Sequence, residues 1–239
     1  MNKTTTAPKG KKEQMRTMFN RIAPTYDKLN HIMSMNIDRS WRKRAMRLVA
    51  EASPREVLDL ATGTADLAID MARALPEVRI VGLDLSTEML AVGREKVARA
   101  GFSERVTLAE GDAEQLPSAD ETFDVVTVAF GVRNFADLPL CLREMHRVLR
   151  PGGRVVILEL STPQNPVVRF CYECYAFRFL PWIGGLISKE QGAYRYLPAS
   201  IRAFHKPATV VEMMQQAGFT VCRAERKTFG IAHIYYAVK

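Results

Sequence analysis

The sequence predicts an α/β protein built around a mostly parallel sheet that ends in an antiparallel hairpin. From Arg55 onwards, short apolar runs typical of strands alternate with segments of helical periodicity. Strands that are apolar on both faces and separated by helices are typical of a parallel sheet covered on both sides. The chain has 239 residues, 47% of them hydrophobic, which suffices for one such domain with a full core.

The segment before this alternation is basic. We predict a disordered basic tail over residues 1–14, because this stretch is polar and lacks an apolar pattern. Residues 15–50 are predicted to form two or three helices, broken near Pro24 and around Asn36. The chain from 15 to 239 is expected to be a single domain.

The alternating segments follow in order along the chain. Strands are predicted at residues 56–59, 79–84, 106–110, 123–129 and 154–160, and helices at 66–74, 87–100 and 138–149. The sequence RPGGR at 150–154 is predicted to stop the last of these helices and to turn into the fifth strand. Beyond Ser161 we expect a helical lid insertion around 163–207, a helix at 210–217, and a terminal hairpin of strands 219–226 and 231–238.

The excess positive charge is confined to the first 50 residues. They contain 12 Lys or Arg and 3 Asp or Glu, whereas the rest of the chain contains 22 and 23. This charge fits either a solvated helix face or attraction to an anionic membrane surface. Aromatic residues are not interleaved with the basic ones, so we expect no nucleic acid as a partner. A nucleic-acid-binding module is the third class of function, after the two classes of enzyme given below, and it would show a steep salt dependence of binding.

The apolar runs and the cysteines bear on compartment and metal binding. No apolar run reaches the roughly 18 residues needed to span a bilayer, and the N-terminus lacks an apolar signal region. We therefore expect a cytoplasmic protein that associates peripherally with the inner face of the membrane. The pair Cys171 and Cys174 lacks a second pair of ligands nearby, so we expect free thiols and no metal site.

Residues 57–86 carry the most informative motif in the chain. An apolar strand ends in a turn of small residues, 61–65, a helix follows, and a second strand ends in Asp84. Small residues at a helix N-terminus let backbone N–H groups approach a ligand, and an acidic residue about 20 positions later suits a ribose diol. Asp112 and Ala113 follow the third strand, where a carboxylate can accept a hydrogen bond from an adenine amino group. The pattern predicts a nucleoside cofactor, although any strand–turn–helix with small residues is the alternative interpretation.

This arrangement resembles the class I S-adenosylmethionine-dependent methyltransferases, whose fold is Rossmann-like. Segments 26–41 (YDKLNHIMSMNIDRSW) and 147–161 (RVLRPGGRVVILELS) are similar to two signatures of the ubiquinone/menaquinone biosynthesis C-methyltransferase family. Segments 130–135 (FGVRNF) and 194–204 (YRYLPASIRAF) also resemble this family, so the resemblance covers about residues 15–239. Leu29 and Asp38 stand where the family usually has Met and His. A proton-transfer role proposed for that His is therefore not general.

The resemblance implies S-adenosyl-L-methionine as the cofactor and a prenylated quinol as the substrate. The expected reaction is C-methylation of a demethylated prenyl naphthoquinol, demethylmenaquinol to menaquinol, in menaquinone biosynthesis. The benzoquinol of the ubiquinone pathway is the alternative substrate. A nicotinamide-dependent oxidoreductase is a weaker alternative, because the first turn lacks the three-glycine spacing that a pyrophosphate needs.

The resemblance also implies which residues bind the cofactor. Thr62 and Gly63 are expected at its methionine end, Asp84 at the ribose hydroxyls, and Asp112 with Ala113 around the adenine. Asp59, at the end of the first strand, either faces the sulfonium or the amino group through water, or orients the turn backbone.

Methyl transfer to carbon needs a ring carbon that is aligned with the sulfonium methyl group and is made nucleophilic by loss of a hydroxyl proton. Arg133 and Asn134, just past the fourth strand, can donate hydrogen bonds to the phenolate-like oxygen. A core ion pair is the alternative role for Arg133. Tyr26 and His205 are weaker candidates for handling the proton. The aromatic segment 169–187 is expected either to pack as a lid or to line a channel for the isoprenoid tail.

Overall fold

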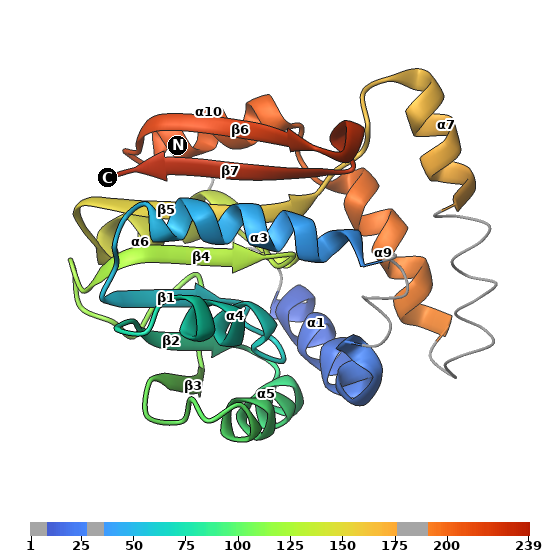
Figure 1. Cartoon of the computed structure of the whole chain (residues 1–239). Coiled ribbons are helices and arrows are strands. Elements are labelled where there is room, and N and C mark those ends of the chain that lie inside the picture. The colour runs from blue at the N-terminus through green and yellow to red at the C-terminus, as the bar shows by residue number, and fades with distance from the viewer. Residues whose placement is uncertain (1–8, 28–35, 176–190) are drawn as a thin grey trace.

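The computed structural model describes residues 9–27, 36–175 and 191–239, and a seven-stranded sheet forms the centre of this part (Figure 1). The strand order is β3-β2-β1-β4-β5-β7-β6. β6 (Thr220–Lys227) and β7 (Ala232–Val238) form a hairpin, and β7 pairs antiparallel with β5. The predicted α/β fold with a C-terminal hairpin is therefore confirmed. The parallel strands are β1 (Glu56–Leu60), β2 (Arg79–Asp84), β3 (Val106–Glu110), β4 (Phe123–Ala129) and β5 (Leu149–Leu160).

Helices cover both faces of the sheet, and each face has its own apolar core. Alternate residues of β5 enter different cores, so that Val156 and Leu158 join α3 while Val155 and Ile157 join α6. This arrangement explains why the strands are apolar without alternation. One face carries α3 (Ile37–Ala50), α4 (Asp66–Ala74) and α5 (Thr87–Arg99), and the other carries α6 (Leu138–Val148) and α10 (Pro207–Gln216) (Figure 1).

The N-terminal helix α1 (Lys9–Ile22) begins earlier than the sequence predicted. The prediction of a disordered tail over residues 1–14 is wrong for residues 9–14, which are helical, whereas residues 1–8 lie outside the described part. Lys12 donates a hydrogen bond to Asp112, which is 100 positions away in the sequence. A contact of this range leaves no local signal, so the start of the helix was missed.

The predicted breaks in the N-terminal helices are confirmed. The 3-10 turn η1 (Ala23–Thr25) contains Pro24 and follows α1 directly. The helix α3 begins after Asn36, whose φ of 60° is left-handed. Asparagine tolerates this conformation better than most residues, which is why it can precede a helix in this way.

β5 is longer than predicted, because it starts before the RPGGR segment. The strand begins at Leu149, and its register against β4 shifts within the first few residues. The N–H of Lys239 donates to the Gly153 carbonyl (2.9 Å), and its carbonyl accepts from the Gly152 N–H (3.1 Å). Gly152 has a φ of +78°. The segment is therefore a bulge inside the strand, and the prediction of a turn before the strand is wrong.

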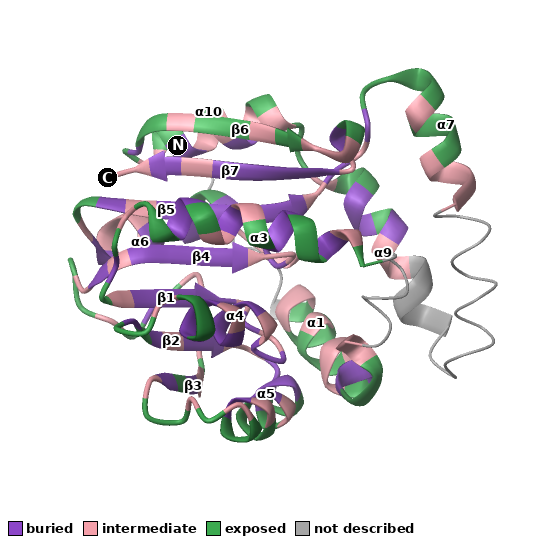
Figure 2. Cartoon of the chain, in the orientation of Figure 1, coloured by how far each residue is buried: buried purple, intermediate pink, exposed green. Residues whose placement is uncertain are grey.

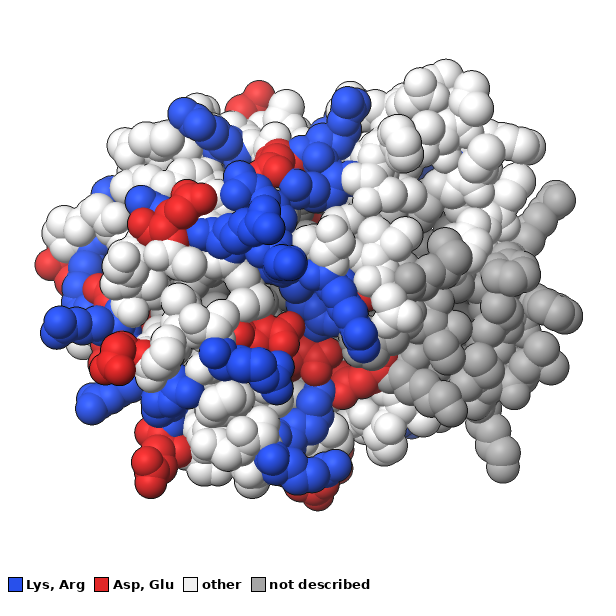
Figure 3. Space-filling model, in the orientation of Figure 1, with Lys and Arg blue, Asp and Glu red and all other residues white. Residues whose placement is uncertain are grey.

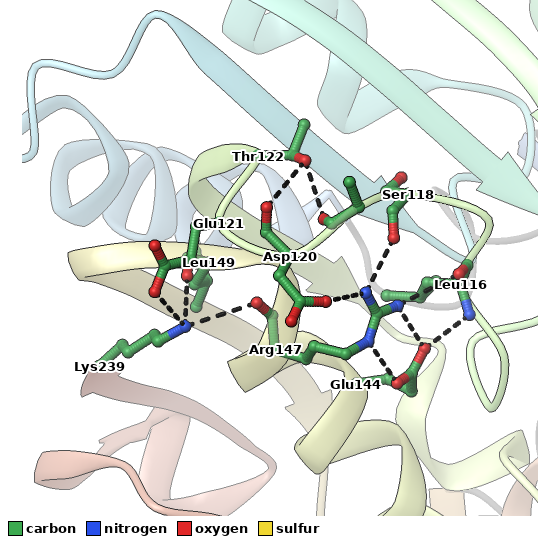
Figure 4. A network of polar contacts seen from close by, with 10 residues as sticks. Leu116, Ser118, Asp120, Glu121, Thr122, Glu144, Arg147, Leu149 and Lys239 are labelled. Atoms are coloured by element: carbon green, nitrogen blue, oxygen red, sulfur yellow. Dashed lines mark hydrogen bonds and ion pairs between the residues drawn. The ribbon is translucent and has the colours of Figure 1, made fainter.

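Arg147 is the first residue of segment 147–161, which resembles the family signature. It joins the amino-terminal edge of the sheet to the loop around residues 116–120 (Figure 4). Its guanidinium donates to Glu144 Oε1 (2.7 Å) and Asp120 Oδ1 (2.7 Å), and also to two backbone carbonyls of the loop. Lys239 donates from Nζ to the Leu149 carbonyl (2.7 Å) beside it. These contacts lie at the opposite end of the strands from the candidate site and hold the fold together.

The region predicted as a lid insertion contains two helices, α7 (Pro166–Cys174) and α9 (Gln191–Ala203). The part of the aromatic segment from 176 to 187, with its predicted breaks at Pro181 and 184–185, lies outside the described residues. α7 contains no buried residue, which is unusual for a helix of its apolar composition. Within the described ranges, no helix combines the length and the hydropathy needed to cross a bilayer.

Candidate active site

The carboxyl ends of the parallel strands open onto two adjoining cavities. The larger has a volume of about 440 Å³ and the smaller a volume of about 90 Å³. Both are lined by Ala61 and Gly63 after β1, by Ala129 and Phe130 at the end of β4, and by Tyr26. Open α/β sheets bind their ligands at this edge, so the cavities lie where the topology predicts a site.

The turn after β1 is built from small residues and is braced by Asp84. Ala61 and Gly63 have left-handed φ values of 51° and 55°. The Gly63 N–H donates to Asp84 Oδ2 (2.8 Å), which ties the turn to the end of β2. Gly82 leaves room for the turn to lie over β2, because a Cβ at that position would be 2.6 Å from Leu108 Cδ2 and 2.9 Å from the Thr62 hydroxyl oxygen.

The smaller cavity collects the three residues predicted to hold the nucleoside, Asp84, Asp112 and Ala113. Burial raises the pKa of Asp84 above its ordinary value, and the backbone N–H groups that it accepts from oppose this only in part. Lys12 of α1 lies 2.6 Å from Asp112 Oδ2 and 2.6 Å from Glu114 Oε2. The N-terminal helix therefore contributes to the wall of the smaller cavity, a role that no sequence motif indicated.

Asp59 lies at the end of β1, is 1% exposed and lines the larger cavity. Its carboxylate accepts hydrogen bonds from the hydroxyls of Thr62 (2.7 Å) and Thr127 (2.6 Å). Burial raises the pKa of Asp59 to about 6, although both hydroxyls favour the charged form. Of its two predicted roles, orientation of the turn through Thr62 is present in the structure, and contact with the cofactor stays a prediction.

A chain of ion pairs forms one wall of the larger cavity, and the sequence did not predict it. Lys96 of α5 bridges Asp27 and Asp66, and Arg42 of α3 bridges Asp66 and Asp38. Burial alone would raise the pKa of Asp66, but the hydrogen bonds and charges of Lys96 and Arg42 lower it. Asp38, which departs from the family pattern, thus has a buried cation as its partner.

The lining of the larger cavity holds more carboxylates than cationic side chains. A cavity with excess negative charge favours a cationic ligand. S-adenosylmethionine carries a sulfonium and an ammonium group against one carboxylate, whereas a nicotinamide dinucleotide brings a negatively charged pyrophosphate. The lining therefore fits the sulfonium cofactor. The acidic residues are Asp27, Asp38, Asp59 and Asp66, and the basic ones are Arg42 and Arg133.

Arg133 comes from the 3-10 turn η2 (Val132–Asn134) and forms the core ion pair that was its alternative interpretation. Its Nη1 lies 2.7 Å from Glu159 Oε1, and its backbone N–H donates to Glu159 Oε2 (3.1 Å). The two side chains are only 6% and 0% exposed. Burial alone would lower the pKa of Arg133, but the charge of Glu159 outweighs this effect, so the pKa is raised overall. Arg133 also lines the larger cavity, so its ion pair stands at the wall of the site.

The other candidates for catalysis are placed unequally. Asn134 lines the smaller cavity, and its Oδ1 accepts a hydrogen bond from the Tyr196 hydroxyl of α9 (2.8 Å). Tyr26 lines both cavities and therefore lies where they join. His205 is exposed and lines neither cavity, so the structure separates it from the site.

The part of the larger cavity that lies away from the strand ends is apolar. Trp41 lines it from α3, and its Nε1 donates to the Thr228 hydroxyl (2.8 Å), which closes the wall between α3 and the turn before β7. Tyr172 is partly buried at the cavity wall, and the loss of solvent there raises its pKa to about 12, even though Arg133 nearby lowers it. The apolar and aromatic lining from α7, α9 and the loop before β7 is Val168, Tyr172, Tyr175, Leu197, Ile201 and Ile231.

Comparison with known proteins decides what this site belongs to. A model of the ubiE/COQ5 methyltransferase family matches residues 7–239. The chain belongs to this family. It is 48% identical over 218 residues to a protein of Thermus thermophilus named demethylmenaquinone methyltransferase, covering 91% of this chain and 98% of that protein. It is 44% identical over 229 residues to a protein of the same name from Bacteroides fragilis, with 96% and 94% covered.

A third relative carries a broader name. The chain is 46% identical over 230 residues to the ubiquinone/menaquinone biosynthesis C-methyltransferase UbiE of Geobacter sulfurreducens, covering 96% of this chain and 90% of that protein. Membership of the ubiE/COQ5 family makes the chain an S-adenosylmethionine-dependent methyltransferase.

Solved structures agree on the fold. A possible histamine N-methyltransferase of Thermotoga maritima superposes with a TM-score of 0.62 at 19% identity, covering 93% of this chain and 99% of that one. An S-adenosylmethionine-dependent methyltransferase of Aquifex aeolicus gives a TM-score of 0.58 at 17% identity, with 81% and 88% covered. The predicted class I methyltransferase fold is therefore confirmed.

Proposed function

We propose that this member of the ubiE/COQ5 family transfers a methyl group from S-adenosyl-L-methionine to a ring carbon of a demethylated prenyl naphthoquinol, converting demethylmenaquinol to menaquinol. The observation that carries the proposal is the position of Arg133, at the wall of a largely apolar cavity that adjoins the nucleoside cavity. The names of the relatives from Thermus thermophilus and Bacteroides fragilis support the choice of substrate.

The cofactor is proposed to span the two cavities. Asp84 accepts from the ribose hydroxyls, and Asp112 with Ala113 surrounds the adenine in the smaller cavity. Thr62, which lines the larger cavity, and Gly63, which lines both, hold the methionine end. Asp59, with an ionised carboxylate, stabilises the cationic end of the cofactor across this junction. The bound cofactor supplies an already activated methyl group, so the protein needs to align and activate the acceptor carbon.

Arg133 is proposed to stabilise the negative charge that develops on the quinol. When a ring hydroxyl loses its proton, electron density moves to the neighbouring ring carbon, which takes the methyl group and then loses its own proton. A guanidinium donor beside the oxygen favours the deprotonated form. Within the described part of the chain, Nε of Arg133 is buried without a hydrogen-bond partner. Glu159 and the Phe130 carbonyl, which both accept from Nη1, therefore do not use all the donors of this guanidinium.

Tyr26 and Asn134 are proposed to position the acceptor. Tyr26 lies where the two cavities join, between the cofactor site and the apolar space. Asn134 is held by the Tyr196 hydroxyl of α9, which fixes its amide at the edge of the smaller cavity. The phenol of Tyr26 can orient a ring hydroxyl and pass on its proton, whereas the Asn134 amide, from the smaller cavity, acts by hydrogen bonding alone.

Peripheral association with a membrane surface follows from the proposed substrate. A quinol with a long prenyl chain partitions into lipid, and the first 50 residues of the chain carry the excess positive charge that an anionic surface attracts. The apolar part of the larger cavity offers room for the first units of the tail. Sedimentation with anionic vesicles at low salt should carry the protein into the pellet, and its recovery in the supernatant would contradict the association.

The substrate is tested by a competition between two quinols under reducing conditions. The purified chain is given S-adenosylmethionine with equal amounts of demethylmenaquinol and the benzoquinol of the ubiquinone pathway, and the products are separated by mass. We expect the naphthoquinol to be methylated faster. Preference for the benzoquinol would reassign the ring system, and methylation of neither quinol would contradict the proposed function.

A further inference from the structure

Large hydrophobic side chains are exposed around the apolar end of the larger cavity. Among the described residues, the most exposed are Phe229 at 74%, Val167 at 70%, Phe170 at 68% and Val221 at 53%. The first three flank residues that line the cavity, whereas Val221 lies near the other end of β6. Exposed apolar groups gathered at one place on a protein mark a site of interaction.

Helix α7 has two apolar faces and no buried residue. Val168, Cys171, Tyr172 and Tyr175 line the cavity from one face, at the spacing of successive helical turns. Val167 and Phe170 stand on another face and are exposed. Figure 2 shows the helix projecting from the body of the protein with exposed and intermediate residues alone. A helix of this composition normally buries such a face against a partner.

Phe229 continues this surface from the other side of the cavity. It lies in the 3-10 turn η4 (Thr228–Gly230) with a φ of 56°, a left-handed conformation that is unfavourable for an aromatic residue. Its neighbours Thr228 and Ile231 line the cavity, so the ring is held outward while they face inward. The Gly230 carbonyl accepts from the Ser161 hydroxyl (2.8 Å), which places η4 beside the chain that leads into α7.

Basic side chains extend from the apolar surface along α3. Arg39, Lys43 and Arg47 are exposed at successive turns of α3 and form a stripe on its outer face. Arg226 is exposed on β6, just before η4. Figure 3 shows this positive charge over α3 and β6, next to the uncharged surface of α7.

We propose that α7 and η4 insert into the interface of an anionic lipid bilayer, with Val167, Phe170 and Phe229 among the acyl chains. The basic stripe on α3 then contacts the headgroups. This docking presents the apolar end of the cavity to the membrane, so a prenylated quinol reaches the site without its tail crossing water. The inference rests on the proposed function and adds to it the face of the molecule that meets the lipid.

The combination of apolar and basic side chains on this surface favours a lipid bilayer over a second copy of the chain as its partner. Self-association through this surface would bring the basic stripes of two molecules towards one another, where like charges repel. An anionic bilayer offers acyl chains for the apolar residues and negative headgroups for the basic ones. The two kinds of side chain are therefore satisfied together by a membrane.

The test measures binding to vesicles of neutral phosphatidylcholine, with and without anionic phosphatidylglycerol. The triple variant Val167→Ser/Phe170→Ser/Phe229→Ser should bind anionic vesicles about tenfold or more weakly than the unchanged chain. The triple variant Arg39→Gln/Lys43→Gln/Arg47→Gln should lose most of the preference for anionic lipid. The matched controls Val221→Ser and Arg79→Gln remove the same kinds of side chain away from the cavity and should bind normally.

A second measurement separates this inference from the proposed function. Methylation of a short-chain quinol in buffer should be unchanged in both triple variants, because none of these residues lines a cavity. Methylation of a long-chain quinol in vesicles should fall with vesicle binding. Normal vesicle binding by the apolar variant, a loss shared by its control, or a change in oligomeric state in light scattering would overturn the docking surface. Failure of the unchanged chain to methylate the short-chain quinol would instead contradict the proposed function.

Discussion

Arg133 shows how one residue can serve both the core and the site. Its guanidinium is buried against Glu159, yet the residue lines the cavity in which the acceptor is proposed to bind. Removing one member of a buried ion pair leaves the other charge without compensation and costs about 3–5 kcal/mol. Truncation to alanine therefore tests stability as much as catalysis, and a substitution that keeps the charge is needed.

Arg133→Lys keeps a cation beside Glu159 but loses the planar guanidinium. We expect kcat for the quinol to fall by about 10²-fold or more, because hydrogen bonds to the developing oxyanion need the donor geometry. The dissociation constant for S-adenosylmethionine, measured by calorimetry, should change little. A variant with unchanged kcat would remove Arg133 from the mechanism, and an equal loss of cofactor binding would give it a purely structural role.

Asp59 predicts a pH dependence of cofactor binding. Burial raises its pKa to about 6, so the carboxyl is protonated below that pH and ionised above it. Because this pKa is raised in the folded state, the folded protein loses stability as the pH rises from the ordinary pKa of an aspartate to about 6. The carboxylate is nevertheless the form that attracts a sulfonium or ammonium group. Affinity for S-adenosylmethionine should therefore decrease as the pH falls through about 6.

Calorimetry across pH, in buffers of different ionisation enthalpy, checks this dependence. Binding near pH 6 should release protons, because the cationic cofactor favours the ionised carboxylate. Asp59→Asn should bind more weakly at neutral pH and should show a flatter pH profile. If the variant keeps the full pH dependence of the unchanged protein, another group titrates and Asp59 only orients the turn.

Among the elements, the ion-pair chain beside the cavity ties Asp27 and α3 to α4 and α5. Lys96→Met leaves Asp27 and Asp66 facing each other without their shared cation. Because these side chains are 22–30% exposed, solvent screens part of the effect, and we expect a loss of about 1–2 kcal/mol in the free energy of unfolding. Denaturant titration measures it.

Arg99→Met on the same helix is the matched control, since Arg99 and its partner Glu95 are each 73% exposed. That variant should change the free energy of unfolding by less than about 0.5 kcal/mol. Equal effects of the two substitutions would show that the ion-pair chain adds nothing to stability beyond an ordinary surface pair.

The elements that the sequence predicts well are those with local signals. β2, β3, β4 and α4 have the predicted bounds, because apolar runs and helical periodicity are properties of neighbouring residues. The RPGGR segment was misjudged because its conformation depends on pairing with Lys239, far along the chain. α1 was missed at its start for the same reason, since Lys12 finds its partner at Asp112.

The residues of the candidate site also divide into those with a signal in the sequence and those without one. The strand-end rule brings Asp59, Asp84 and Asp112 to one edge of the sheet, where the structure places them around the cavities. The partner of Arg133, Glu159 on β5, had no signal, because buried ion pairs are formed by residues that only the folded chain brings together. Lys96 was unpredicted for that reason too.

In the molecule as a whole, the lining of the larger cavity differs in charge from the surface around its apolar end. Carboxylates outnumber cationic side chains in the lining of the larger cavity, whereas exposed apolar side chains and the basic stripe of α3 lie outside it. The neutral product S-adenosylhomocysteine lacks the sulfonium charge that the acidic lining favours. This difference favours release of the product after transfer.

The site is proposed to transfer a methyl group to carbon on a reduced naphthoquinone ring. The most direct measurement supplies S-adenosylmethionine with a deuterated methyl group, together with demethylmenaquinol, and locates the label in the product by mass spectrometry and NMR. We expect the intact deuterated methyl group to be bonded to a ring carbon. A label on a ring oxygen, or a quinol that gains no label while the enzyme binds its cofactor, would contradict it.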